Sequence, residues 1–264
     1  MLSAPRIHHK RLKPITAKTS GYPNSAGINA EMEFQTATMP SQIDLFYQID
    51  QAFKKSPNVA RIFHGDRRIC QGGRGRRTAL FPSRKCGGHV PLESQLELAY
   101  AVVLERSPLV RDYRTQAIRI PLPGGRSAHP DFLIRTVDGT FEIHEVKPSI
   151  EYLSAEAIQR FATIGELLAR TGIGFKVVDA SDLCSGVELQ KLLGQYSRGH
   201  IQAISQQQID LGTTILRDGN INSFSEAYKL LREQQLPVQL ADYLHFHQQW
   251  AFRSAKGLPN DQNY

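Results

Sequence analysis

The sequence predicts an α/β protein, in which a mixed β-sheet core is flanked by helices and followed by a mainly helical C-terminal domain. Two patterns carry this prediction. Residues 91–180 pass from helical periodicity to strands, then to a second helix and a further strand, an order typical of a mixed-sheet core. From residue 182 onward the pattern is mostly helical and rich in Gln.

Residues 1–60 are expected to form a basic N-terminal arm and one helix. The first 40 residues are rich in Pro, Ser, Thr, Gly and Asn and have little apolar periodicity, as linkers do. Ser41 can cap a helix that runs to about residue 55. The predicted apolar face of this helix consists of Ile43, Phe46, Ile49 and Phe53.

The core domain is expected to span residues 61–180. Residues 64–90 are rich in Gly and Arg and are predicted to be irregular. Pro91 suits the first position of a helix lasting to about residue 106, because a helix leaves that N–H unused anyway. Its predicted apolar stripe consists of Leu92, Leu96, Ala99, Tyr100 and Val103. The elements predicted after it are strands at 116–122, 131–137 and 141–147, a helix at 154–170 and a strand at 175–178.

Residues 181–264 are predicted to be a helical or winged-helix-like domain. Residues 223–234 and 238–250 have helical patterns on either side of a short Gln-Leu-Pro break. Two interpretations fit this pattern equally well. One is a helix-turn-helix or winged-helix unit, and the other is a generic helical tail.

Positive charge is concentrated in the first third of the chain. Of a formal net charge of +7, residues 1–90 contribute 15 Lys and Arg against 5 Asp and Glu. Arginines on a Gly-rich backbone suit phosphate, because each guanidinium can donate two parallel hydrogen bonds. This pattern predicts DNA binding, with a solvated basic arm as the alternative. The candidate DNA-binding residues are Arg67, Arg68, Arg74, Arg76, Arg77, Arg84 and Lys85.

The sequence also limits the compartment in which the protein works. It has three cysteines, an odd number without tight spacing, which favours a reducing environment such as the cytoplasm over a disulfide scaffold. It has no apolar run of the roughly 18–20 residues that a membrane span needs, and its first residues lack the apolar core of a secretory signal, so we expect a cytosolic protein. A Zn²⁺ set with loose spacing is a weaker alternative use of four residues, His64, Cys70, Cys86 and His89.

The strongest chemical signal is a Pro130-Asp131 pair followed by Glu145 and Lys147. Hydrolysis of a phosphodiester by metal ions needs carboxylates that hold Mg²⁺ against the scissile phosphate. A lysine at the same point can orient the attacking water or offset the charge that develops on phosphorus. Glu145 and Lys147 share a strand face because they are two residues apart.

The turn between the two strands decides whether Asp131 joins them. A two-residue loop at Asp138-Gly139 would place Asp131 opposite Val146, on the wrong face. A three-residue loop that begins at Val137, with Gly139 in a left-handed conformation, places Asp131 opposite Glu145. We therefore predict the three-residue loop.

A third carboxylate is available upstream, at Glu93 or Glu97 on the predicted helix. A helix glutamate before a strand Asp and a Glu-x-Lys is the arrangement of restriction-endonuclease-like nucleases. His129 and His144 flank the proposed metals and could serve as outer donors.

An ordered series of short motifs extends this pattern over roughly residues 75–150. It resembles TnsA, the endonuclease subunit of heteromeric, cut-and-paste bacterial transposases. The motifs are Phe81-Pro82-Ser83-Arg84-Lys85, Glu93-Ser94-Gln95-Leu96-Glu97, Pro108-Leu109-Val110, Tyr113-Arg114-Thr115-Gln116, His129-Pro130-Asp131-Phe132-Leu133-Ile134 and Glu145-Val146-Lys147-Pro148.

The resemblance implies roles for individual residues. Glu97, rather than Glu93, matches the family's S-x-x-E metal ligand, Asp131 its PD aspartate and Lys147 its motif lysine. Glu145 falls where the family varies between Glu and Gln. Gln116 is recurrent in the family and would position the metal-bound water or the DNA, with structural support of the helix–sheet junction as an equal alternative. The predicted catalytic set is therefore Glu97, Asp131, Glu145 and Lys147, with the three carboxylates as metal ligands and Gln116 and His129 in support.

The resemblance also implies cofactors and partners. Two Mg²⁺ ions, for which Mn²⁺ would substitute, would cleave double-stranded DNA at the 5′ ends of a transposon, in the bacterial cytoplasm at the nucleoid. A DDE-type, TnsB-like transposase would cut the 3′ ends under a TnsC-like ATPase, and the C-terminal domain would contact these partners. The alternatives are a stand-alone restriction or junction-resolving nuclease and a non-catalytic DNA-binding adaptor.

Overall fold

The computed structural model describes residues 42–54 and 79–252. These residues form a mixed α/β structure with seven α-helices and three β-sheets, and they all belong to one compact unit. Among them, no helix is both long enough and apolar enough to cross a membrane. The predicted arm at 1–40 lies outside the described residues.

A four-stranded sheet in the order β3-β6-β7-β8 carries the core. Strands β3 (Val110–Thr115), β6 (Phe132–Thr136) and β7 (Phe141–Lys147) pair antiparallel, whereas β8 (Gly174–Asp179) runs parallel to β7. Helix α3 (Ala155–Ala169) makes the crossover that a parallel pair requires. The predicted mixed sheet is therefore confirmed.

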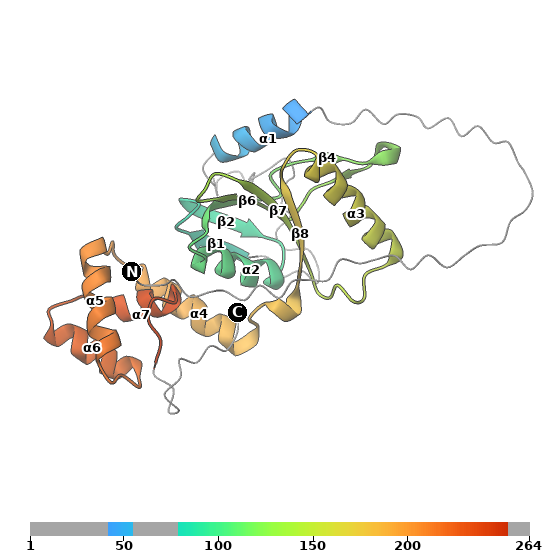
Figure 1. Cartoon of the computed structure of the whole chain (residues 1–264). Helices are drawn as coiled ribbons and strands as arrows, with labels where there is room; N and C mark the ends of the chain where they lie inside the picture. Colours follow the sequence, from blue (N-terminus) through green and yellow to red (C-terminus); the bar gives the residue numbers. More distant parts are fainter. Residues whose placement is uncertain (1–41, 55–78, 253–264) are drawn as a thin grey trace, which may run out of the picture. The chain divides into compact units, whose positions relative to one another are not determined.

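Helices cover both faces of this sheet (Figure 1). Because successive strand residues point to opposite faces, β6 divides its side chains between two hydrophobic cores. Phe132 and Ile134 pack in the core of helix α2 (Gln95–Arg106), while Leu133 packs in the core of α1 and α3. The two faces of β6 thus pack against different helices.

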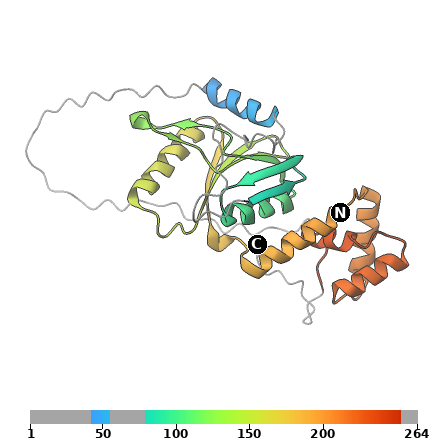
Figure 2. The ribbon, with the colours of Figure 1, turned by 180° about the vertical axis from the view of Figure 1, so that it is seen from behind.

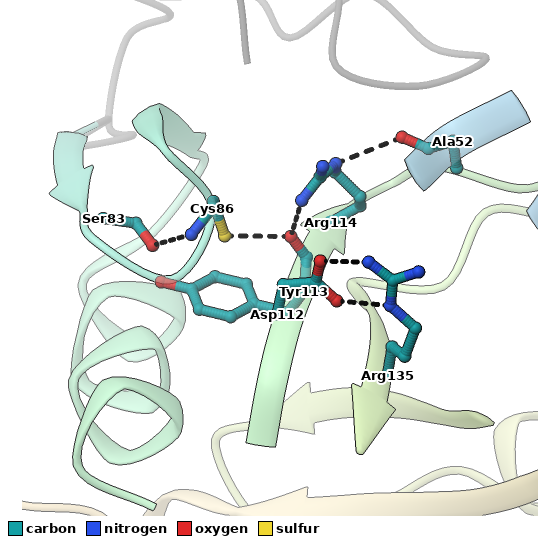
Figure 3. Close-up of polar contacts among 7 residues, drawn as sticks. All are labelled: Ala52, Ser83, Cys86, Asp112, Tyr113, Arg114 and Arg135. Carbon is teal, nitrogen blue, oxygen red and sulfur yellow. Dashed lines mark hydrogen bonds and ion pairs between the residues drawn. The ribbon is translucent and has the colours of Figure 1, made fainter. Parts of the chain in front are cut away.

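Helix α1 (Gln42–Lys54) confirms the predicted helix to within one residue at each end and is tied to the sheet by arginines (Figure 3). Arg114 Nε donates to the Ala52 carbonyl oxygen at 3.1 Å, and Arg135 forms a two-pronged ion pair with Asp112 at 2.8 and 2.5 Å. Both guanidinium groups also lie over the Phe53 ring.

The predicted apolar face of α1 needs one correction. Phe46 is exposed, and Leu45 is buried together with Ile49. The arginine contacts at Ala52 and Phe53 fix the rotation of the helix on the sheet, which places Leu45 rather than Phe46 in the core.

The prediction of irregular structure up to residue 90 is wrong for residues 79–90. Strands β1 (Ala79–Ser83) and β2 (Gly88–Leu92) form a hairpin that lies beside α2, as seen from behind in Figure 2. Pro91 belongs to β2, where a two-stranded hairpin tolerates its missing N–H. Helix α2 therefore begins later than predicted, at Gln95.

The predicted strand at 116–122 is also wrong, because the strand of the main sheet is β3 and ends at Thr115. Gln116 has a φ of 45°, which breaks the strand. After it, only Ile120–Pro121 is extended, as β4, which pairs with β5 (Ser127–Ala128). The charged and polar residues of β3 do not show the alternation typical of a strand, although its last three residues are buried.

The C-terminal helices are α4 (Gly186–Gly199), α5 (Gln206–Asp218), α6 (Phe224–Glu233) and α7 (Leu240–Phe246). Helices α6 and α7 confirm the two predicted there, although α7 is shorter at both ends. Trp250 is buried, and its indole N–H donates to the Leu216 carbonyl oxygen at 3.1 Å. Between residues 186 and 252 the structure has no strand, so the mainly helical interpretation fits and a wing has no counterpart there.

Candidate active site at the ends of strands β6 and β7

The β6–β7 hairpin has the predicted register. Phe132 pairs with His144, which places Asp131 opposite Glu145. The Thr136 N–H donates to the Thr140 carbonyl oxygen at 3.0 Å, which leaves a loop of three residues. Gly139 ends this loop with a φ of 87°, a conformation that favours glycine. The three-residue loop is confirmed, and both carboxylates share one face.

Asp131, Glu145 and Lys147 converge at these strand ends. The Lys147 ammonium lies 2.7 Å from Glu145 Oε1 and 3.8 Å from Asp131 Oδ2. Backbone groups hold the acids in place: the Val146 N–H donates to Asp131 Oδ2 at 2.8 Å, and the Asp131 N–H to Glu145 Oε2 at 3.3 Å. The three side chains are between 14% and 24% exposed, so water reaches them only partly.

Burial and charge together perturb Asp131. Removal from water and, after it, the neighbouring charge of Glu145 raise the pKa of its carboxyl to about 7, against the opposing effect of Lys147. A single ammonium thus faces two carboxylates in a poorly hydrated place. Such a site favours the binding of an additional cation.

Glu97 lies in the first turn of α2, and both of its carboxylate oxygens are engaged by that turn. Oε1 accepts from the Ser94 hydroxyl at 2.9 Å, and Oε2 accepts from the Glu93 N–H at 2.8 Å. Ser94 in turn accepts from the Glu97 N–H at 3.1 Å as the N-cap of the helix. Burial is the main cause that raises the pKa of Glu97, and Lys147 lowers it.

The structure therefore brings together two of the three predicted ligands. Within residues 42–54 and 79–252, no three His, Cys, Asp or Glu side chains are grouped so that they could hold a metal ion. Asp131 and Glu145 meet, whereas Glu97 is turned toward its own helix cap. Capping is a role that the S-x-x-E spacing itself could have indicated.

Gln116 directly follows β3 and is joined to Asp131 through its backbone. Its N–H donates to the Asp131 carbonyl oxygen at 3.1 Å, in the unfavourable backbone conformation noted above. The side chain is 3% exposed, and its Oε1 has no hydrogen-bond partner among the described residues. An amide oxygen is among the oxygen donors that Mg²⁺ accepts, and the backbone of Gln116 is tied to Asp131.

The two histidines that flank the motif lie differently. His129 is half-buried directly before Pro130. His144 is buried, with Nε2 2.9 Å from Glu142 Oε2 and its other ring nitrogen bonded to the Tyr100 hydroxyl. It is directed to the face of β7 opposite to Glu145, because the two residues are adjacent on the strand.

Among the predicted DNA-binding residues, five arginines (Arg67, Arg68, Arg74, Arg76 and Arg77) lie outside the described residues. Arg84 and Lys85 form the β1–β2 turn, and both bind backbone. The Lys85 ammonium donates to the carbonyl oxygens of Ser107 and Val110, the latter at 2.6 Å, and Arg84 donates to His200. These two side chains therefore stabilise the hairpin turn.

The alternative Zn²⁺ set gains little support. Cys86 is buried, and its thiol donates to the Tyr113 carbonyl oxygen at 2.9 Å, while burial raises its pKa to about 11 (Figure 3). His89 is exposed. His64 and Cys70 lie outside the described residues.

Two further residues support the site and were not singled out from the sequence. Phe161 of α3 lies under Lys147, with the ammonium 5.8 Å from the ring centroid. Asp179, the last residue of β8, accepts from the Ile150 N–H at 2.6 Å and fixes the loop that follows Lys147. In the sequence, Phe161 is only one of several apolar residues in the helix predicted at 154–170.

No protein-family model matches this chain, and a search of curated proteins finds no match either. The class of the protein must therefore follow from its own residues. What the structure shows is two partly buried carboxylates and a lysine that meet at adjacent strand ends of a mixed sheet.

Proposed function

We propose that the protein is a Mg²⁺-dependent DNA endonuclease with a restriction-endonuclease-like core, acting as a TnsA-like subunit of a bacterial transposase. The observation that carries this proposal is the β6–β7 register. It puts Asp131, Glu145 and Lys147 on one face, where the lysine lies within ion-pair distance of both carboxylates.

The donor set suits magnesium. Asp131 and Glu145 would hold Mg²⁺, with Mn²⁺ as a substitute, and Glu97 would add a carboxylate from α2 if it gave up its capping bonds for a second ion. When bound, the ions supply charge neutralisation at the phosphate and favour ionisation of water.

The chain's own groups would position and stabilise the reacting atoms. The Lys147 ammonium, held by Glu145 and supported by the Phe161 ring, would donate to the attacking water or offset negative charge at phosphorus. The N–H groups of Val146 and Asp131 keep the two carboxylates oriented before substrate binds. The amide of Gln116 would orient water or a phosphate oxygen.

The DNA and protein partners follow from the same proposal. The stripe from Arg67 to Arg77 would bind the phosphate backbone, since Arg84 and Lys85 are engaged in the fold. A TnsB-like transposase and a TnsC-like ATPase would be the protein partners, and residues 181–264 would contact them. Cleavage would fall at the 5′ ends of the element.

A second candidate, a non-catalytic DNA-binding adaptor, is favoured by one observation. Glu97 is occupied by its helix cap, and Lys147 already neutralises Glu145. An adaptor predicts that Mg²⁺ does not raise the melting temperature of the protein. A nuclease predicts that it does, because an ion that binds only the folded state stabilises it.

The test is a nicking assay on transposon-end DNA with Mg²⁺, with and without the transposase subunit. Asp131→Ala should abolish cleavage, and Lys147→Ala should lose at least about 10²-fold in rate, as expected when a preorganised electrostatic group is removed. Glu151→Gln, which removes an exposed carboxylate of the neighbouring loop, should cleave like the wild type.

Melting curves would establish that each variant is folded. Cleavage at nearly the wild-type rate by Asp131→Ala or Lys147→Ala would show that the site is wrong. The protein would be the adaptor if the wild type binds DNA but does not cut it, whether or not the transposase subunit is present, and if Mg²⁺ does not stabilise it.

A further inference from the structure

Arg160 lies next to the candidate site on helix α3. Its guanidinium carbon is 5.0 Å from the centroid of the Phe161 ring, and the Lys147 ammonium is 5.8 Å from the same centroid. Phe161 itself is buried in the core shared by α1, α3 and the sheet. One rigid aromatic ring therefore holds two cations near each other.

The two cations differ in how their charges are compensated. Lys147 pairs with Glu145 and Asp131. Arg160 is exposed, and within the described segments no carboxylate pairs with it. Glu156, one helical turn earlier, is paired instead with Arg126 at 3.0 Å. The guanidinium thus keeps its donors available at the edge of the site.

We propose that Arg160 binds a backbone phosphate of the DNA strand that is cut, adjacent to the phosphate addressed by Lys147. This inference rests on the proposed nuclease function and assigns it a substrate-positioning residue. Phosphates on one strand follow each other at roughly 3.4 Å of helical rise, so two cations on one ring can meet neighbouring phosphates. The planar guanidinium suits this contact, because it can donate two parallel hydrogen bonds to phosphate oxygens.

The experiment compares Arg160→Gln with Arg232→Gln, which removes another exposed arginine, on helix α6. Affinity of the full chain for a fluorescent duplex is measured with Ca²⁺ over roughly 50–200 mM salt, and cleavage with Mg²⁺ is measured at rising DNA concentration. Arg160→Gln should weaken binding several-fold and reduce the log–log salt slope by about 0.9 unit, the share of one phosphate contact.

A positioning role makes two further predictions. The maximal cleavage rate of Arg160→Gln at saturating DNA should stay near wild type while KM rises, and Arg160→Lys should restore most of the salt slope. Arg232→Gln should match the wild type in both measurements.

The possible failures are distinguishable. An Arg160→Gln variant with the slope and KM of Arg232→Gln would overturn the phosphate contact and leave the nuclease proposal standing. Loss of the maximal rate together with a lowered melting temperature would also overturn it, since Arg160 would then act only through the packing of Phe161. A wild-type chain that neither binds nor cuts DNA would overturn both proposals.

Discussion

His200 and His247 show how strongly burial can lower the pKa of a single side chain. Their Nε2 atoms are 3.2 Å apart, and His200 Nδ1 lies 2.8 Å from the Tyr196 carbonyl oxygen. Two facing ring nitrogens form a hydrogen bond only when one of them lacks a proton. Burial is the main cause that lowers the pKa of both rings, that of His247 to about 3, and the charges of Lys85 and Arg106 add to the effect at His247.

Acid should therefore destabilise the fold through this pair. Between pH values near 3 and 6.5, the unfolded chain binds protons that the folded His247 does not, so the free energy of unfolding falls as the pH decreases. Urea unfolding at about pH 8 and about pH 5 would measure this loss. His247→Gln should lose less stability than the wild type over this interval, whereas the variant of an exposed residue, His89→Gln, should lose as much. Equal losses in all three proteins would argue against the pair.

At the scale of elements, helices α4 and α7 approach each other closely at Gly199. A Cβ atom there would lie 2.7 Å from the Tyr243 N and 2.8 Å from its Cα, and these backbone atoms cannot turn aside. Arg198 donates to the buried Asp242 beside this contact, at 3.0 and 2.8 Å. The absence of a side chain at Gly199 thus sets the distance between the two helices.

Gly199→Ala should lower the free energy of unfolding by about 1–3 kcal/mol, the usual cost of overpacking. Gly165→Ala on α3 is the matched control, because its Cβ would meet only Phe175 Cδ1, at an ordinary 3.6 Å. That change should raise the free energy of unfolding by about 0.5–1 kcal/mol, since alanine suits a helix interior better than glycine. Chemical denaturation measures both, and a neutral Gly199→Ala would show that α4 and α7 can separate at little cost.

At the scale of the whole molecule, one core joins the sheet to the C-terminal helices. Tyr196 of α4 and Phe246 of α7 pack in the same core as α2 and the β1–β2 hairpin. The Tyr196 hydroxyl also donates to the Pro82 carbonyl oxygen at 2.8 Å and accepts from the Arg84 N–H at 2.9 Å. The predicted boundary at residue 180 thus falls between segments that share one hydrophobic core.

A chain that ends at residue 180 should therefore fail to unfold as one cooperative transition. It would lack Leu189, Leu192 and Tyr196 of α4, and the apolar surface that α4 and α7 cover would be exposed. Calorimetry of the shortened and full chains would compare the two. A sharp transition in the shortened chain would instead support two independently folding domains.

The sequence by itself determined the β6–β7 hairpin and thereby the centre of the site. Turn chemistry at Asp138-Gly139 and the two-residue repeat of a strand are local properties, so they fixed the position of Asp131 opposite Glu145 without any knowledge of the fold. Helices with clear periodicity, α1 and α3 among them, were predictable for the same reason.

Only the tertiary structure decided the strand β3 and the orientation of Glu97. The charges of Asp112 and Arg114 hide a strand because their partners, Arg135 and Ala52, are distant in the sequence. Glu97 has a spacing that suits both a metal ligand and a helix cap, and the choice depends on where α2 starts relative to the sheet. Local sequence patterns cannot decide such cases, because the partner that buries or pairs with each of these side chains is brought near only by the folding of the whole chain.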